Sequence, residues 1–499
     1  MTAYKILIEK NRKLKYLPGF LVVAVISILP LFAHLEELPL QRWDESRLAL
    51  AAFEMLQHKN WFVTTFFWQK DITVLKPPLQ IWLIAASIKI FGTNELAVRL
   101  PAALSALATC LFMYWFLAAK LKKPLAGIFA PAILVVCAAY VRIHGVRTGD
   151  YDSLLTLFTT IFLCYYFLYL SKQSSRHLLI AMVALTLACF TKSVAALMFM
   201  PGVFLFTLFN RQVLTVLKDK TFYAGLLIFI IIIPGYYILR EQLAPGSLQG
   251  LVDNELGGRF LKTLERHHQP WNFYIWYIFD TGFVWIPLAV AGIMAMFATG
   301  DKDENLFRSF ISISLIGYLV VISMAGTKLD WYTMPMYPLM SMLAGLFVAQ
   351  CFEMAGRLPG RSNAVKTLLL LILGFGISYY LGYSETLDRV MKPQVNMNDK
   401  TFSVSHYLQL INQKKKPVEN LVLLYSELEQ EMIWYDHIDS NMRFESVFKL
   451  KAGDEVMAYM PGNKSIIEGT YTCIKTDEYY DIYRYRITGR LPDSVIAKH

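Results

Sequence analysis

The chain has 499 residues, of which 56% are apolar and only 17% are charged. Because an ordinary soluble domain carries about 25% charged residues, this composition excludes a disordered chain, a coiled coil and a typical cytosolic enzyme. It predicts a polytopic membrane protein. The net charge of +10 fits basic loops that flank membrane spans, so no nucleic-acid partner is expected. The six cysteines have no zinc-type spacing, which argues against both a disulfide framework and a cysteine metal site.

Eleven segments are long and apolar enough to be candidate membrane spans. The junction at Thr191-Lys192 leaves open whether the fifth and sixth segments are one broken span. The pattern as a whole predicts an all-α membrane domain with about 11 to 13 transmembrane helices. The segments are 17–34, 98–119, 124–142, 153–170, 177–191, 194–210, 222–239, 273–298, 308–325, 332–353 and 366–384.

The positions of Lys and Arg predict which loops share a side of the membrane. Basic clusters occur at the N-terminus and after every second span, which places that side in the cytoplasm. This alternation requires that the apolar segment 79–92 does not cross. At about 14 residues, and with Gln80, Ser87 and Lys89 in it, the segment is better interpreted as an interfacial helix.

The opposite side then receives the largest polar parts of the chain. The loop 35–97 and the C-terminal region 385–499 both fall on the periplasmic side of a bacterial inner membrane. We therefore divide the chain into a transmembrane domain, 1–384, and a soluble α/β domain, 385–499. Alternating stretches such as Leu421–Tyr425 predict strands in the second domain.

Acidic and basic side chains collect on this outer side. Taken alone, Asp44 is explained as a capping residue of a helix, and Lys76 as an interfacial lysine. Lys192 is harder to explain, because a lysine inside an apolar stretch costs on the order of 3 kcal/mol and usually faces a cavity or a partner. The other candidates are Glu45, Arg47, His144, Arg147, Asp150, Asp152, Asn254, Glu255, Arg259, Arg266, His267, His268, Lys328 and Tyr332.

This mixture of charges suits a phosphate-bearing lipid. At a water–lipid boundary, cations can hold a departing phosphate, and a carboxylate can accept the proton of an attacking hydroxyl. An ion channel or a proton relay would instead need charged groups deep within the spans. No phosphate-binding loop of the Walker or GxGxxG type is present. The adjacent His267 and His268 are interpreted as solvated rather than as metal ligands.

Eight short motifs occur in a fixed order along the chain. They are Asp44-Glu45-x-Arg47, Lys76-Pro77-Pro78-Leu79, Phe91-Gly92-x-Asn94-Glu95, Arg99-Leu100-Pro101, Asp152-x-Leu154, Phe190-Thr191-Lys192, Arg259-Phe260 and Lys328-Leu329-x-x-Tyr332-x-x-Pro335. This order resembles the GT-C glycosyltransferases that use polyprenyl-phosphate sugars. Within that superfamily the chain is most similar to the bacterial lipid A aminoarabinose transferases, and the protein O-mannosyltransferases are more distant kin.

The resemblance implies a GT-C fold with juxtamembrane helices in the large periplasmic loop. It implies that Asp44 and Asp152 are catalytic and that further motif residues bind the substrate; Lys192 and Lys328 are added on charge and placement. The expected substrate-binding residues are Glu45, Arg47, Lys76, Lys192, Arg259, Lys328 and Tyr332.

Two positions depart from the pattern of the aminoarabinose enzymes. Leu75 stands where they have an acidic residue, and Asn254 where they have a histidine. In that family both positions are associated with a bound zinc. No metal ligand is therefore assigned in this chain, and a requirement for a divalent metal stays open.

These expectations combine into an inverting glycosyl transfer on the periplasmic side. The donor is expected to be an undecaprenyl-phosphate-linked sugar, the acceptor a lipid A-like lipid or a protein, and no cofactor is required. Two alternatives are a flippase for a lipid-linked sugar and a non-catalytic membrane scaffold whose tail binds a partner. A flippase would usually show inverted repeats, and the sequence has no internal repeat.

Overall fold

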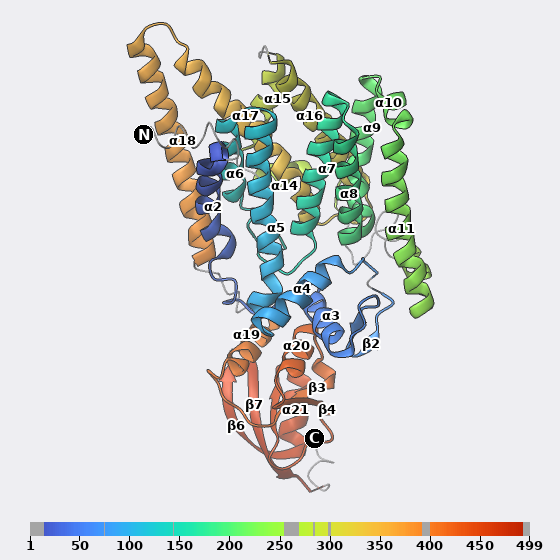
Figure 1. Ribbon diagram of the computed structural model, residues 1–499. Coiled ribbons are helices and arrows are strands. Elements are labelled where there is room, and N and C mark those ends of the chain that lie inside the picture. The colour runs from blue at the N-terminus through green and yellow to red at the C-terminus, as the bar shows by residue number, and fades with distance from the viewer. Residues whose placement is uncertain are drawn as a thin grey trace.

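The structure, a computed structural model, describes residues 14–73, 75–142, 144–253, 269–282, 285–297, 301–391 and 400–492. A helical bundle stands above a smaller α/β domain, and short helices fill the layer between them (Figure 1). The predicted class, an all-α membrane domain with juxtamembrane helices and a C-terminal α/β domain, is confirmed.

Within the described residues, seven helical stretches are long and apolar enough to cross a membrane, and four further apolar helices are shorter. All eleven predicted segments contain helix. The helices of the bundle are α2 (Leu17–Phe32), α5 (Glu95–Trp115), α6 (Pro124–Val135), α7 (Asp152–Lys172), α8 (Ser175–Lys192), α9 (Met200–Phe209), α10 (Val213–Lys218), α11 (Lys220–Leu243), α14 (Phe273–Tyr277), α15 (Ile286–Met294), α16 (Lys302–Met324), α17 (Tyr337–Gly356) and α18 (Arg361–Met391).

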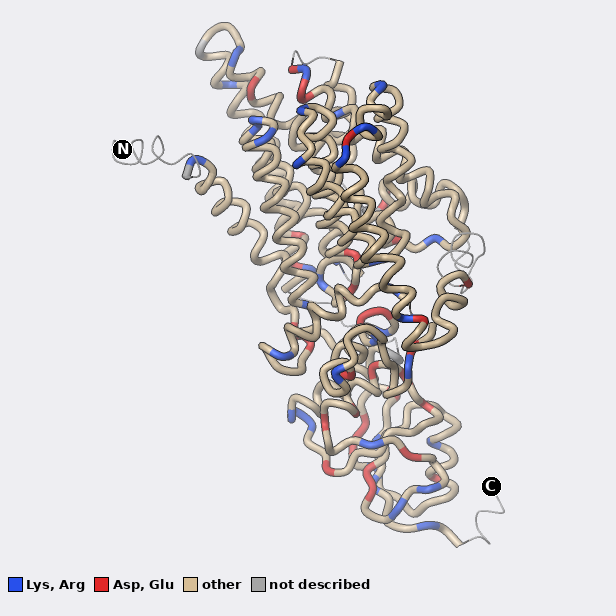
Figure 2. Tube along the Cα trace, turned by 45° about the vertical axis from the view of Figure 1, so that its right-hand side comes forward, with Lys and Arg blue, Asp and Glu red and all other residues tan. Residues whose placement is uncertain are grey.

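Basic loops lie at one end of the bundle. Figure 2 shows Lys and Arg at the loops that are remote from the α/β domain. They belong to the clusters that the sequence analysis places together on the cytoplasmic side. The other end of the bundle meets the juxtamembrane helices and then the α/β domain (Figure 1).

Small residues let the bundle helices approach closely. A Cβ atom built on Gly345 of α17 would lie only 2.7 Å from the backbone nitrogen of Ala130 on α6. Such close approach favours helix association in a membrane, where lipid tails remove the hydrophobic driving force between helices. In contrast, α18 exposes Leu370 and Leu373, as a helix that faces lipid is expected to do.

The chain reverses direction at Ser193, which has a positive φ of 49°. Before it, α8 ends at Lys192 beside the N-terminus of α7. After it, the short helix η3 (Ser193–Phe199) leads into α9, and Gln212 then donates to the carbonyl of Leu170 near the C-terminus of α7. The fifth and sixth predicted segments are therefore separate and run in opposite directions, so the question left open by the sequence is resolved.

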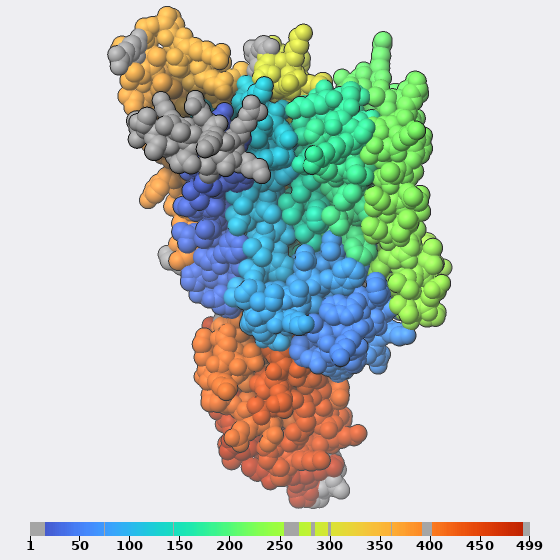
Figure 3. Space-filling view, viewed as in Figure 1, coloured from blue at the N-terminus to red at the C-terminus, as the bar shows by residue number. Residues whose placement is uncertain are grey.

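The segment between α2 and α5 forms the layer under the bundle. It contains α3 (Asp44–His58), the hairpin β1 (Thr65–Phe66) and β2 (Gln69–Lys70), and α4 (Leu79–Phe91). With 13 residues, α4 is about 20 Å long, which is too short for a hydrocarbon core of about 30 Å. It matches the predicted interfacial helix. Figure 3 shows this layer, in blue, between the bundle and the α/β domain.

The α/β domain is built around a five-stranded mixed sheet in the order β4-β3-β5-β7-β6. The strand β3 lies between β4 and β5 and is parallel to both, whereas β5, β7 and β6 pair antiparallel. All four residues of β3 are buried, as expected for a strand covered on both faces. Its elements are α19 (Lys400–Asn412), β3 (Leu421–Leu424), α20 (Gln430–Ile438), β4 (Met442–Glu445), β5 (Glu455–Ala458), α21 (Pro461–Thr470), β6 (Tyr471–Tyr479) and β7 (Ile482–Arg490).

The α/β domain contacts α3 and α5 through α20. His437 Nε2 of α20 lies 3.1 Å from Glu54 Oε1 of α3, and both side chains are buried. The Tyr435 hydroxyl donates to Glu95 Oε1 of α5 at 2.9 Å. Because α3 begins at Asp44, these contacts connect the α/β domain with the segment that carries the predicted site.

Candidate active site

A cavity of about 50 Å³ lies where the bundle meets the juxtamembrane layer. Its polar lining consists of Lys76, Asp152, Lys192, Tyr318 and Tyr332. All of these except Tyr318 are predicted from the sequence as site residues. They come from five separate parts of the chain: the loop before α4, the start of α7, the end of α8, α16, and the short helix η7 (Asp330–Met336).

Asp152 and Lys192 form an ion pair in the wall of this cavity. The Lys192 Nζ donates to both carboxylate oxygens of Asp152 at 2.6 Å, and the two side chains are less than a tenth exposed. The Lys192 ammonium also lies 5.6 Å from the centre of the Tyr332 ring. A lysine buried in the membrane needs such partners, and the pair brings the ends of α7 and α8 together with η7.

Lys76 joins the cavity to Asp44. Its Nζ lies 3.8 Å from Asp44 Oδ1 and 4.8 Å from the centre of the Tyr151 ring. The Lys76 side chain is 6% exposed, whereas that of Asp44 is 34% exposed. Asp44 is the first residue of α3, where the positive end of the helix favours a carboxylate. Asp44 is thus a solvent-accessible carboxylate beside a buried cation.

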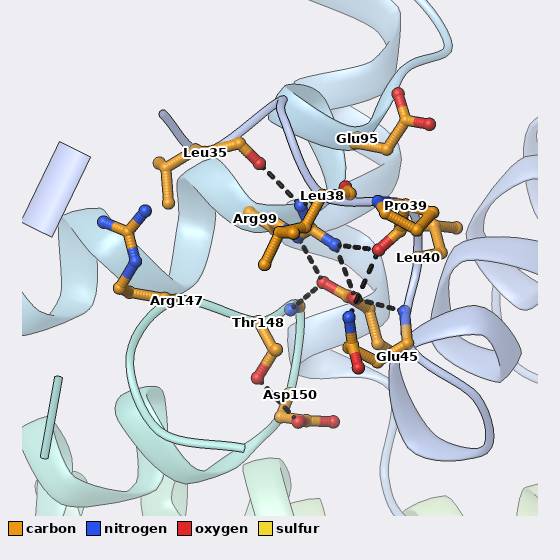
Figure 4. A network of polar contacts seen from close by, with 12 residues as sticks. Leu35, Leu38, Pro39, Leu40, Glu45, Glu95, Arg99, Arg147, Thr148 and Asp150 are labelled. Atoms are coloured by element: carbon orange, nitrogen blue, oxygen red, sulfur yellow. Dashed lines mark hydrogen bonds and ion pairs between the residues drawn. The ribbon is translucent and has the colours of Figure 1, made fainter. Parts of the chain in front are cut away.

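Glu45, predicted to bind the substrate, is not among the residues that line the cavity. Glu45 is fully buried and accepts hydrogen bonds from Arg99 Nε at 2.7 Å and from Arg99 Nη2 at 2.9 Å. It also accepts from the backbone N–H groups of Gln41 and Gly149. Figure 4 shows Glu45 and Arg99 facing each other at the centre of this network. These hydrogen bonds hold the first turn of α3, in which Asp44 precedes Glu45.

Arg47 also has a protein partner rather than a place in the cavity lining. Its Nη2 donates to Asp71 Oδ2 at 2.7 Å and to Thr73 Oγ1 at 2.6 Å. Burial would raise the pKa of Asp71, but the Arg47 charge and the hydrogen bonds from Thr73 outweigh burial and lower that pKa. The fully buried Arg240 of α11 in turn donates to the Asp71 carbonyl at 2.7 Å. The side chain of Arg47, on α3, is therefore held against the loop that follows the β1–β2 hairpin.

Lys328, another predicted substrate-binding residue, is not among the residues that line the cavity. The Lys328 Nζ donates to the carbonyl of Ala325 at 2.8 Å, and the residue is 8% exposed. Ala325 itself lines the cavity, so Lys328 supports the loop beside it. Arg259 lies outside the described residues, as do Asn254, Glu255, Arg266, His267 and His268.

The turn between α6 and α7 carries residues that the sequence analysis noted without giving them a role in the site. His144 Nδ1 lies 3.1 Å from Asp150 Oδ2, and the ring of His144 stacks on Trp331 with centroids 4.5 Å apart. Asp150 precedes Asp152 by two positions, and Trp331 precedes Tyr332. In the sequence, His144 stands a few residues before the motif residue Asp152, and this spacing could have indicated a role in the site. Its stacking partner Trp331 could not be found this way, because it is distant in sequence.

Of the two zinc-associated positions, the structure describes only Leu75, whose side chain does not fit a divalent metal. Leu75 is 1% exposed and offers no ligand atom. A Cβ atom built on Gly250 of α12 (Ser247–Leu251) would lie 2.8 Å from the Leu75 Cδ1, so apolar packing occupies this place. Among the described residues, no group of three or more His, Cys, Asp or Glu side chains could hold a metal ion.

Comparisons with known proteins point to one class. The family model described as dolichyl-phosphate-mannose-protein mannosyltransferase matches residues 75–238. An undecaprenyl phosphate-alpha-4-amino-4-deoxy-L-arabinose arabinosyl transferase from Pseudomonas savastanoi pv. phaseolicola is 26% identical over 373 residues. That match covers 72% of this chain and 66% of the relative.

Solved structures give the same fold. ArnT from Cupriavidus metallidurans, bound to undecaprenyl phosphate, superposes with a TM-score of 0.70 at 16% identity, and the match covers 93% of this chain and 97% of that one. The oligosaccharyltransferase of Archaeoglobus fulgidus matches with a TM-score of 0.53 at 12% identity over 96% of this chain and 76% of that one. In sequence and in fold, the chain is therefore similar to membrane glycosyltransferases of the GT-C type, and it resembles the aminoarabinose transferases and the protein mannosyltransferases.

Proposed function

We propose that the protein transfers a sugar from an undecaprenyl-phosphate-linked donor to a lipid A-like lipid or a protein. The observation that carries this proposal is the cavity in which Lys76, Lys192 and Tyr332 meet Asp152. Two cations and a phenol at a membrane boundary suit a lipid phosphate. The relative named for an undecaprenyl-phosphate sugar and the ArnT structure bound to undecaprenyl phosphate support this donor.

In the proposed reaction, the acceptor oxygen attacks the anomeric carbon as the bond from that carbon to the phosphate oxygen breaks. Attack opposite the departing group inverts the configuration at this carbon. Lys76 and Lys192 stabilise the negative charge that the lipid phosphate gains, and their burial strengthens that interaction. Arg259 is proposed to contact the same phosphate, whereas Arg47 is proposed to hold the loop beside the cavity through Asp71. The donor phosphoester supplies the driving force, so no nucleotide is needed.

Asp44 is the proposed catalytic carboxylate. Its side chain is 34% exposed at the rim, within 3.8 Å of the Lys76 ammonium, so an acceptor entering from the aqueous side meets it first. If the acceptor is a hydroxyl, Asp44 takes its proton. If the acceptor is a phosphate, it is already ionised, and Asp44 orients it. Asp152 contributes by keeping the Lys192 ammonium in the wall of the cavity.

We further propose that the cavity and the α/β domain face the periplasm across the bacterial inner membrane. The support is the gathering of Lys and Arg at the other end of the bundle (Figure 2), because basic loops remain in the cytoplasm. Membrane lipids surround the bundle, and the lipid donor reaches the cavity from the outer leaflet.

The substitution Asp44→Asn tests the catalytic assignment, since it keeps the size of the side chain and removes its charge. For a hydroxyl acceptor, transfer should fall by about 100-fold or more. Asp303→Asn is the matched control, because Asp303 is exposed in the first turn of α16, at the end of that helix far from the cavity. Near-wild-type transfer by Asp44→Asn at equal expression would refute the assignment.

The acceptor is identified by mass spectrometry of lipid A and of envelope glycoproteins, with and without the gene. One of the two should lose the mass of a single sugar when the gene is deleted, and the lost mass gives the class of sugar. An unchanged mass in both fractions, with a lipid-linked sugar that only changes leaflet, would contradict transfer.

A further inference from the structure

Two contacts join the turn between α6 and α7 to the short helix η7. Arg142 of the turn pairs with Asp330 at the start of η7. His144 stacks on Trp331, with ring centroids 4.5 Å apart and ring planes 20° from parallel. The residue after Trp331 is Tyr332, which lines the cavity. The turn leads directly into α7, whose first residue, Asp152, also lines the cavity. The two contacts therefore hold the α7 wall and the η7 wall of the cavity together.

His144 is placed to carry a positive charge. Burial alone would lower its pKa, but the hydrogen bond and the charge of Asp150 outweigh burial and raise the pKa to about 9, with smaller contributions from Asp44 and Glu45. Asp150 Oδ2 is fixed in turn by the Thr148 hydroxyl at 2.8 Å. At neutral pH the ring is therefore an imidazolium that donates to a buried carboxylate.

The charged groups on the elements packed around His144 do not oppose its protonation. Its own turn contributes Asp150 and Arg142, α3 contributes Asp44 and Glu45, and η7 contributes Asp330. Arg142 and Asp330 neutralise each other as a pair. The other charges that act on the ring are the carboxylates of Asp150, Asp44 and Glu45, which favour its protonated form.

We propose that His144 is a positioning residue of the transferase, which as an imidazolium holds Tyr332 and Asp152 at a fixed separation across the cavity. Its charged hydrogen bond to Asp150 fixes the α7 wall, and its cation–π contact with Trp331 fixes the η7 wall. Loss of the proton weakens both contacts at once. This inference rests on the proposed function, because the cavity is the one assigned to sugar transfer.

The sign of the pH dependence follows from the raised pKa. The contacts are complete well below pH 9 and are lost as the pH rises through about 9. A displacement of about 1 Å in one wall can cost up to about 100-fold in rate. The transfer rate of the wild type should therefore decline by about 10-fold or more above pH 9. The rate of His144→Gln should already be reduced to that level below pH 9 and should not decline further.

Trp331 fluorescence tests the contact independently of activity, because an imidazolium quenches a stacked indole more strongly than a neutral imidazole does. The emission of Trp331 in the full-length protein is taken as the difference between the wild type and Trp331→Phe. It should rise in a step near pH 9. The step should vanish in His144→Gln and move to lower pH in Asp150→Asn. His177→Gln, on α8 at the other end of the bundle, is the matched control and should keep the step.

A fluorescence step that persists in His144→Gln, or that stays at the same pH in Asp150→Asn, would overturn the inference. If His144→Gln does not fold, Asp150→Asn alone decides, because it keeps the imidazole and removes its partner charge. Failure of the proposed function can be distinguished from failure of this inference. In that case the wild type would transfer no sugar from undecaprenyl-phosphate donors while the step near pH 9 remained.

Discussion

Replacing Arg99 by methionine should release the segment that carries Asp44. The Arg99 guanidinium makes five hydrogen bonds in the structure: two to the Glu45 carboxylate, and one each to the carbonyls of Leu35, Leu38 and Pro39. In Arg99→Met the carbonyls lose their donor. The Glu45 carboxylate stays buried with only backbone N–H groups as partners.

The magnitude follows from the burial of both partners. Arg99 is 3% exposed and Glu45 is fully buried, and removing one partner of a buried ion pair typically costs about 3–5 kcal/mol. At about 1.4 kcal/mol for each factor of ten, the local opening of this segment should become about two to four orders of magnitude more frequent. In Arg99→Lys the frequency of opening should lie between those of Arg99→Met and the wild type, because lysine keeps the positive charge but lacks the planar guanidinium.

Hydrogen exchange followed by mass spectrometry measures this opening. Peptides that contain the N–H groups of Gln41 and Gly149, which both donate to Glu45, should exchange faster in Arg99→Met. The control is Arg389→Met, which breaks an exposed pair with Glu385 and should leave exchange near wild type, since exposed pairs contribute about 0–1 kcal/mol. Unchanged exchange at Gln41 and Gly149 in Arg99→Met would refute the reasoning.

Two further predictions concern the docking of the α/β domain and the packing of the bundle. Burial would lower the pKa of His437, but Asp436 and Glu54 outweigh burial and raise it. Docking on α3 should therefore be strongest below about pH 6.5 and weaken as the pH rises through the raised pKa. Limited proteolysis across this pH range should detect the weaker docking as faster cleavage at higher pH. If Glu54→Gln showed the same pH response, the role of the His437–Glu54 pair in docking would be contradicted. Gly345→Val should lower the thermal stability of the purified protein, by about 1–3 kcal/mol, because its Cβ would meet the Ala130 backbone at 2.7 Å. An unchanged melting temperature would show that α6 and α17 can separate freely.

The sequence by itself determined the membrane class and the apolar segments that form the helices of the bundle. A run of about 20 apolar residues is a local property, and its cost in water does not depend on the rest of the fold. For the same reason the 13-residue α4 could be recognised as too short to cross. Lys192 was placed beside a cavity because a charge in an apolar stretch needs a partner, although the sequence did not name that partner.

The tertiary structure decided which of the charged residues face the cavity and which serve the scaffold. Glu45 and Arg47 share a motif with Asp44, yet Arg99 and Asp71 hold them in other directions. His144 acquires its stacking partner only when η7 reaches the turn before α7, and α3 adds to the raised pKa that Asp150 of the same turn gives it. These outcomes depend on contacts between segments far apart in the chain, and a side chain's role in such contacts is fixed by the path of the backbone rather than by the neighbouring sequence.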